Sequence, residues 1–125
     1  MGGTVSTIII AGSRDWTDRE LIKLELNRVV EECHDREPIT VVTGGARGAD
    51  TIGHDVAVDA GHATTVMFAK WDMHGNSAGY KRNVEMAKVS THLLAFWDGH
   101  SRGTMHMINI ARERGLNVRV IREGQ

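Results

Sequence analysis

Five short runs of apolar and β-branched residues recur along this sequence, and the segments between them have helical spacing. The runs cover residues 5–11, 39–43, 63–68, 93–97 and 118–121. Short runs that are apolar on both faces are typical of buried parallel strands. Parallel strands need crossover connections, which are right-handed and here helical. The sequence therefore predicts an α/β fold with an open, doubly wound parallel sheet, strand order 3-2-1-4-5 and helices on both faces.

Local signals indicate where the helices begin and end. Asp18 is a predicted N-cap, and apolar residues follow it at helical spacing from Leu21 on. Gly61 and Gly115 predict the ends of the second and fourth helices. Segment 69–79 is polar and contains glycine, so it is predicted as a loop. Such a loop is longer than the usual connection of about two to six residues.

The composition is that of one globular domain. The chain has 125 residues, of which 41% are hydrophobic and 25% are charged. Domains of about 100–150 residues are common, so we expect a single domain over residues 1–125. The formal net charge is -1. This balance disfavours a protein that coats nucleic acid by bulk charge or adheres to a membrane through a polybasic surface.

The cysteine, histidine and hydropathy patterns bear on the cellular compartment, on membrane spans and on metal sites. Cys33 is the single cysteine, which excludes an intramolecular disulfide and suits a reducing compartment such as the cytoplasm. No apolar run approaches the roughly 18–20 residues that a membrane span needs. The seven histidines do not form the helical pair of a zinc site, so no metal is expected.

The segments that follow the strands are rich in glycine and arginine. Because the carboxyl ends of parallel strands meet at one edge of a sheet, we expect these segments to converge on a crevice between the first and fourth strands. Glycine lets backbone N–H groups approach oxygen atoms, and arginine adds paired donors for phosphate. The pattern therefore predicts a site for a phosphate-bearing ligand. Its predicted ligand-binding residues are Gly12, Ser13, Arg14, Gly44, Gly45, Ala46, Arg47, Gly48, Asp50, Asn83, Asp98, Ser101, Arg102, Gly103 and Thr104.

Three common motifs are absent from these segments. The first strand is not followed by Gly-x-Gly-x-x-Gly, so the standard fingerprint for NAD or FAD is not met. The segment from Gly44 to Asp50 lacks the Gly-Lys-Ser/Thr ending of a P-loop, and no Gly-x-Ser-x-Gly nucleophile elbow occurs. No cofactor is therefore expected.

Several candidate residues also have a simpler interpretation. Asp15 and Asp50 could bond ribose hydroxyls or act as a general base, but a turn former and a first-turn helix residue would look the same. Trp16 and Trp71 could stack on a base, and packing of a loop onto the domain is the alternative. Arg82, near the start of a helix, could face an anion or form a surface salt bridge.

The same segments resemble the SLOG superfamily. This Rossmann-like group joins the DNA-processing protein DprA (Smf) to the LOG phosphoribohydrolases, and the YspA-like branch is the nearest in pattern. The resemblance extends over nearly the whole chain and implies a Rossmann-like nucleotide-binding domain. The matching pieces are, in order, Gly12-Ser13-Arg14, Gly44-Gly45-Ala46-Arg47-Gly48-Ala49-Asp50, Lys81-Arg82-Asn83 with Met86, and Ser101-Arg102-Gly103-Thr104.

The resemblance also assigns catalytic positions. LOG enzymes cleave the N-glycosidic bond of a nucleoside 5′-monophosphate, and their catalytic arginine falls at Arg82. Their catalytic glutamate falls at Met107, which cannot act as an acid or a base. Asp15, Asp50 or Glu85 could substitute for it, and we take Arg82, Asp15 and Glu85 as candidate catalytic residues. Pairing between Glu85 and Arg82, one helical turn apart, would explain Glu85 equally well.

These observations predict a binding protein, or sensor, for a small phosphorylated nucleotide-like ligand. One alternative is an N-glycosidase that acts on nucleoside monophosphates. Another is a single-stranded DNA-binding protein of the DprA type, which the net charge of -1 disfavours. A neutral chain with one cationic crevice suits a small ligand better than a nucleic-acid strand. The sequence leaves open whether the chain forms a homo-oligomer.

Overall fold

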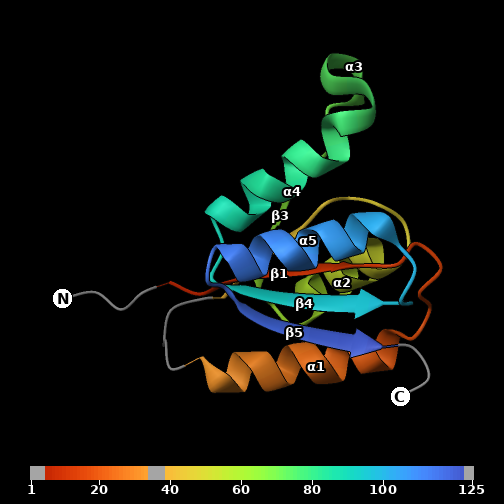
Figure 1. Cartoon of the computed structure of the whole chain (residues 1–125). Helices are drawn as coiled ribbons and strands as arrows, with labels where there is room; N and C mark the ends of the chain where they lie inside the picture. The colour runs from red at the N-terminus through yellow and green to blue at the C-terminus, as the bar shows by residue number, and fades with distance from the viewer. Residues whose placement is uncertain (1–4, 34–38, 123–125) are drawn as a thin grey trace.

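The computed structural model describes residues 5–33 and 39–122 of the chain. Strands and helices alternate along it, as Figure 1 shows. The elements are β1 (Thr7–Gly12), α1 (Arg19–Glu32), β2 (Thr40–Thr43), α2 (Ala49–Asp59), β3 (Ala63–Val66), α3 (Trp71–His74), the 3-10 turn η1 (Gly75–Ser77), α4 (Ala78–Lys88), β4 (His92–Trp97), α5 (Arg102–Glu113) and β5 (Asn117–Arg122).

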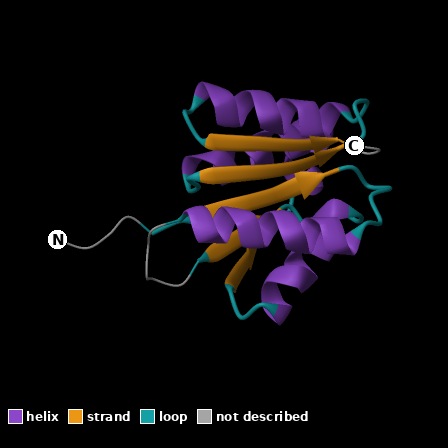
Figure 2. Ribbon diagram, turned by 90° about the horizontal axis from the view of Figure 1, so that it is seen from below, coloured by secondary structure: helices purple, strands orange, loops and turns teal. Residues whose placement is uncertain are grey.

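The strands form one parallel sheet in the order β3-β2-β1-β4-β5, which confirms the predicted fold and strand order. Ile9 of β1 lies opposite Val42 of β2 on one side and Leu93 of β4 on the other. The order of the strands reverses between β1 and β4, because β2 lies on one side of β1 and β4 on the other. The helices lie on both sides of the sheet (Figure 2).

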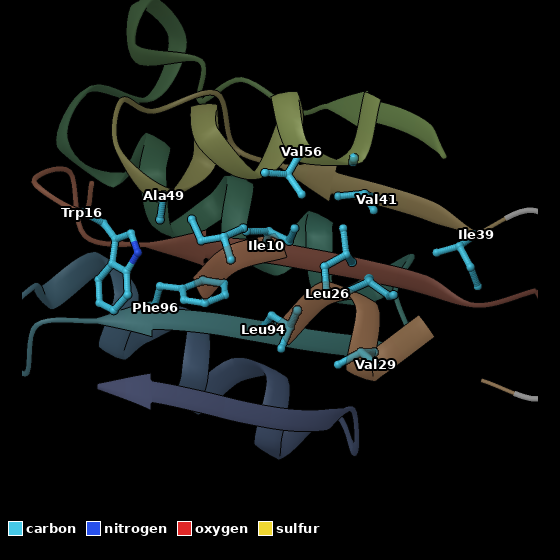
Figure 3. Close-up of a cluster of buried hydrophobic side chains, with 13 residues drawn as sticks. Ile10, Trp16, Leu26, Val29, Ile39, Val41, Ala49, Val56, Leu94 and Phe96 are labelled. Carbon is cyan, nitrogen blue, oxygen red and sulfur yellow. The ribbon is translucent and has the colours of Figure 1, made fainter. Parts of the chain in front are cut away.

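The triple isoleucine of β1 builds both layers of the core. Ile8 and Ile10 point to the face that α1 and α2 cover, where Leu26 and Val56 join the same buried cluster (Figure 3). Ile9 points to the other face, where it lies in a cluster with Met86 of α4 and Met107 of α5. Alternate side chains of a strand point to opposite faces, so a strand that is apolar throughout must be covered on both.

The caps agree with the sequence signals. The Asp18 side chain accepts a hydrogen bond from the backbone N–H of Leu21, at 3.0 Å, and so caps α1 as predicted. Gly115 has a positive φ of 78° directly after α5. The left-handed conformation ends the helix and favours glycine at this position.

Segment 69–79 is not the continuous loop that the sequence predicted. It contains α3 and η1, and α4 already begins at Ala78. None of the α3 residues is buried, and local hydrogen bonds to the carbonyl oxygens of Lys70 and His74 hold the segment. A helix without a buried face has no apolar periodicity, so the pattern could not reveal it. Figure 1 shows that α3 projects away from the sheet, beyond the start of α4.

Gly53 in α2 gives a test of this packing. A Cβ at Gly53 would overlap the Ile10 side chain, which is fully buried in β1. Helix propensity alone would favour alanine by up to about 1 kcal/mol. We expect Gly53→Ala to lower the free energy of unfolding by about 1–3 kcal/mol instead, because the core is overpacked. Urea denaturation measures the change.

Gly103→Ala is the matched control, since nothing lies within 4 Å of a Cβ at this helical glycine. Its free energy of unfolding should stay unchanged or rise slightly. A stabilised Gly53→Ala protein would contradict the close packing of α2 on β1.

Candidate functional site

A cleft opens where the order of the strands reverses, at the carboxyl ends of β1 and β4. Its volume is about 250 Å³. The first turns of α2, α4 and α5 all contribute to its walls. Its lining residues are Ala11, Gly12, Arg14, Ala46, Asp50, Trp71, Asn76, Gly79, Tyr80, Arg82, Asn83, Met86, Ser101, Gly103, Thr104 and Met107.

A second hollow of about 380 Å³ adjoins the cleft. The two share the residues Arg14, Ala46, Trp71 and Arg82. The second hollow is completed by Gly44, Gly45, Arg47, Phe68 and Ala69. Ordinary small-molecule sites begin at about 300 Å³. The cleft alone lies just below this size, and the adjoining hollow exceeds it.

Arg82 is fixed to the main chain of two strand ends. Its Nη1 donates to the carbonyl oxygens of Gly44, at 2.5 Å, and Met67, at 3.4 Å. Its Nε donates to Oδ1 of the neighbouring Asn83 at 3.1 Å. A Cβ on Gly44 would overlap the Arg82 guanidinium, so a side chain at this position would displace the guanidinium from its present place. The arginine therefore faces the cleft in one orientation and is not part of a surface salt bridge.

Asp50 is a buried carboxylate on the other side of Gly44. Its Oδ2 accepts hydrogen bonds from the backbone N–H groups of Gly44, at 3.1 Å, and Ala46, at 3.3 Å. Burial raises the pKa of Asp50 to about 6, against the opposing effects of the bond from Ala46 and the charge of Arg82. Among the described residues that line the cleft, Asp50 is the sole carboxylate.

Arg14 adds a second guanidinium to the same cleft. No described residue forms a hydrogen bond or ion pair with the Arg14 side chain. Burial lowers the pKa of Arg82, the charge of Asp50 opposes this, and the charge of Arg14 lowers it further. Two cations thus lie close enough to repel each other, and an anion between them would relieve the repulsion.

The first turn of α5 lines the same cleft as these cations. The Ser101 side chain accepts from the backbone N–H of Thr104, and Asn83 Nδ2 donates to the carbonyl oxygen of Gly103 at 3.2 Å. Asp98 accepts from the backbone N–H groups of His100 and Ser101, and these bonds hold the pKa of its carboxyl below the usual range. Asp98 therefore forms the turn before α5 and does not line the cleft.

The structure brings most of the predicted ligand-binding residues together. Eight of them line the cleft, and three more line only the adjoining hollow. The eight are Gly12, Arg14, Ala46, Asp50, Asn83, Ser101, Gly103 and Thr104. Arg82, a candidate catalytic residue, lines the cleft as well. The three are Gly44, Gly45 and Arg47.

Other predicted residues lie outside both hollows. Ser13 is buried, and its Oγ accepts from the backbone N–H of Asp98 at 2.9 Å. Gly48 has a positive φ of 78° and packs against the carbonyl oxygens of Ser13 and Arg14. Both residues shape the loops beside the cleft. Arg102 is exposed on the first turn of α5.

Two of the candidate catalytic carboxylates lie away from the cleft as well. Asp15 is 90% exposed and faces Arg47 at 3.6 Å. Glu85 pairs with Lys88 at 2.9 Å, so the expected pairing with Arg82 does not form. Glu85 faces a different groove, along the outer side of α4.

The sequence missed the contribution of the segment before and at the start of α4. Asn76, Gly79 and Tyr80 line the cleft, although the first two lie in the predicted loop and none of the three was a predicted site residue. Trp71 lines both hollows, whereas Trp16 is buried against Phe96 in the core (Figure 3). The exposed aromatic residues Trp71 and Tyr80 are the feature of the sequence that could have indicated this wall of the cleft.

Two other features concern metals and membranes. No cluster of three or more histidine, cysteine, aspartate or glutamate side chains suited to a metal ion occurs within residues 5–33 and 39–122. Over the same part of the chain, no helix has the length and apolar character that crossing a membrane requires.

The fold and the cleft define a Rossmann-like α/β protein with a ligand site at the switch point of its sheet. Residues 6–74 match the model of the YspA, cpYpsA-related SLOG family. The chain belongs to this family.

Two known proteins illustrate the relationship. The Gene 61 protein of Mycobacterium phage D29 is 37% identical over 119 residues, which cover 89% of this chain and 92% of the phage protein. The structure resembles that of DNA processing protein A (DprA) from Streptococcus pneumoniae, with a TM-score of 0.71 and 16% identity. That likeness covers 93% of this chain but only half, 50%, of the DprA chain, and it concerns the fold.

The raised pKa of Asp50 predicts how stability depends on pH. Because the folded protein holds this proton more tightly than an ordinary carboxyl of pKa 3.8, protonation favours the fold. The contribution is fully present below about pH 4 and is lost as the pH rises through about 6. We expect Asp50→Asn to be more stable than the natural protein at pH 8, by up to about 3 kcal/mol.

Urea denaturation at pH 5 and pH 8 measures this difference. Asp72→Asn is the control, because Asp72 is an exposed carboxylate on α3. The control should leave the pH dependence unchanged. An Asp50→Asn protein that follows the pH dependence of the natural protein would show that Asp50 is ionised without cost in the fold.

Proposed function

We propose that the cleft binds a small nucleotide or nucleotide-derived ligand through its phosphate, in a binding or sensor role. The observation that carries the proposal is the pair of guanidinium groups of Arg14 and Arg82 on one cleft. Asp50 lines the same cleft and carries at most one negative charge, so it balances no more than one of the two guanidinium charges. An anion is the ligand that such an arrangement favours.

The α5 wall offers the second half of a phosphate site. Ser101, Gly103 and Thr104 lie at the helix N-terminus, where the helix dipole attracts anions. The N–H groups of Ser101 and Thr104 are already bonded to Asp98 and to the Ser101 side chain, so the contact to an anion falls to the Gly103 backbone and the two hydroxyl groups. No atom lies within 4 Å of a Cβ built on Gly103, so the backbone there is open to a ligand. A phosphate between this turn and the arginines would contact both walls of the cleft.

A focused cleft favours a small ligand over a nucleic-acid strand. The net charge of the chain is -1, and the two unbalanced cations converge on one hollow instead of following a groove. Nucleic acid therefore stays the disfavoured partner. We also expect a cytoplasmic location, in which Cys33 would stay reduced. The chain could form a homo-oligomer. The proposed binding site depends on neither expectation.

Substitution of the arginines tests the phosphate site. Calorimetry with nucleoside 5′-monophosphates, cyclic nucleotides and ADP-ribose identifies a ligand of the natural protein. We expect Arg14→Ala to weaken its binding by roughly tenfold to a hundredfold, since a charged hydrogen bond contributes about 1.5–3 kcal/mol. Arg82→Lys keeps the charge but loses the contacts to Gly44 and Met67, and should also weaken binding.

Arg112→Ala is the matched control, because Arg112 is exposed in the last turn of α5, away from the cleft. Its affinity should match that of the natural protein. Equal weakening by Arg112→Ala and Arg14→Ala would point to bulk charge instead of a site. Absence of binding by every compound of the panel would overturn the proposal.

A second candidate function is hydrolysis of the N-glycosidic bond, and one observation favours it. Asp50 is a carboxylate in the cleft with a pKa of about 6, a value suited to proton transfer near neutral pH. Against it, Met107 lines the cleft at the position of the LOG glutamate, and the backbone N–H groups of Gly44 and Ala46 already donate to the Asp50 carboxylate.

Chromatography for free base separates the two candidates. We expect nucleoside monophosphates to stay intact after long incubation with the protein, which supports binding without catalysis. Release of base that Asp50→Asn abolishes, while Asp72→Asn does not, would instead establish the hydrolase.

A further inference from the structure

Trp71 differs from the other two tryptophans in having no partner that explains its position. Trp16 is 3% exposed and packs on Phe96. Trp97 donates to the carbonyl oxygen of Ser101 and lies under the Arg122 guanidinium. Trp71 is 53% exposed, and within the described residues its indole N–H has no hydrogen-bond acceptor. Trp71 and Tyr80 are both exposed large hydrophobic residues that line the same cleft, and apolar surface gathered at one hollow marks a binding site.

The Trp71 ring stands at the border of the cleft and the adjoining hollow. It lines both, together with Arg14 and Arg82. Its edge lies against Gly79, where a Cβ would come within 3.5 Å of the ring. This is an ordinary van der Waals distance, so the indole lies against the start of α4, where it borders the cleft.

Tyr80 continues this aromatic rim over the cleft. It is 45% exposed, and its ring is backed by the His106 ring, with the centroids 4.4 Å apart and the planes tilted by 41°. His106 Nδ1 lies 3.2 Å from Asn83 Nδ2, and Asn83 itself lines the cleft. The Tyr80 ring is therefore connected through His106 to Asn83, a polar residue that lines the cleft.

We infer that Trp71 and Tyr80 form a subsite for an aromatic base, so that the ligand is a nucleotide and not a sugar phosphate. The inference rests on the proposed function, which places the phosphate between Arg14 and the first turn of α5. An aromatic rim beside these cations lets one ligand engage both: the phosphate meets the arginines, and the flat base covers the exposed rings. Stacking on an aromatic side chain tolerates different bases, because every base has a π-face.

The base subsite would give the short helix α3 a role in ligand binding. None of the α3 side chains is buried, so the core does not require this short helix. Trp71, the first residue of α3, lines the cleft. Figure 1 shows that α3 itself projects away from the sheet. The helix acts as a support that holds an aromatic ring beside the ligand.

A comparison of nucleotides with ribose 5-phosphate tests the subsite. Calorimetry with AMP, GMP, CMP and UMP gives the tightest monophosphate, and ribose 5-phosphate measures the contribution without a base. We expect the nucleotide to bind roughly tenfold more tightly or better. Trp71→Ala should lower nucleotide affinity to near that of ribose 5-phosphate and leave the latter unchanged, and Trp71→Phe should restore most of the difference.

Met73→Ala is the matched control, because Met73 is 72% exposed on the same helix but does not line the cleft. It should bind both compounds as the natural protein does. Thermal melting checks that the variants keep their fold, which we expect because Trp71 is not buried. Tryptophan fluorescence should be quenched by the nucleotide in the natural protein, and the quenching should be lost in Trp71→Phe.

The failure of this inference differs from the failure of the proposed function. Equal affinity for the nucleotide and for ribose 5-phosphate, with Arg14→Ala weakening both, would overturn the base subsite and leave the phosphate site standing. Unchanged nucleotide affinity in Trp71→Ala would overturn it as well. Binding of neither compound to the natural protein would overturn the phosphate site and the base subsite together.

Discussion

The cleft depends on a buried carboxylate, Asp50, and a half-buried guanidinium, Arg82, which share the backbone of Gly44. Its N–H donates to Asp50 and its carbonyl oxygen accepts from Arg82, so one peptide segment lies between a carboxylate and a guanidinium. This arrangement joins the end of β2 to the first turn of α2 and to α4. Burying either charge alone would be costly, and the backbone bonds offset part of that cost. Any side chain at Gly44 would separate the two groups.

This contact determines how the protein presents positive charge. Arg82 is held by carbonyl oxygens and cannot turn away to solvent, whereas Arg14 has no described partner and can adjust to a ligand. The Asp50 carboxylate accepts hydrogen bonds from backbone N–H groups of the loop that follows β2. The cleft therefore keeps local positive charge in a chain whose net charge is -1. Net charge describes the whole surface, while a ligand responds to the field of its own site.

Much of the cleft was predictable, because the topology of a parallel sheet brings the loops after its strands to one edge. Arg14, Gly44, Arg82 and Ser101 were found in this way. Sheet topology alone does not distinguish residues that line the cleft from residues that hold its loops in shape. Ser13 and Asp98 bond to each other's segments, and a glycine-rich or polar loop looks the same in sequence whether its side chains face a ligand or the main chain.

The sequence by itself determined the layers of the fold, since the β1 isoleucines and the amphipathic helices leave one way to bury their apolar faces. It also determined that glycine and arginine would meet at the switch point. Only the tertiary structure decided which carboxylate lies in the cleft: Asp50 is inside, while Asp15 and Glu85 pair with nearby cations outside it. Only the tertiary structure placed α3, with Trp71, at the rim. Side-chain direction and burial are set by packing between distant segments, and no local pattern encodes them.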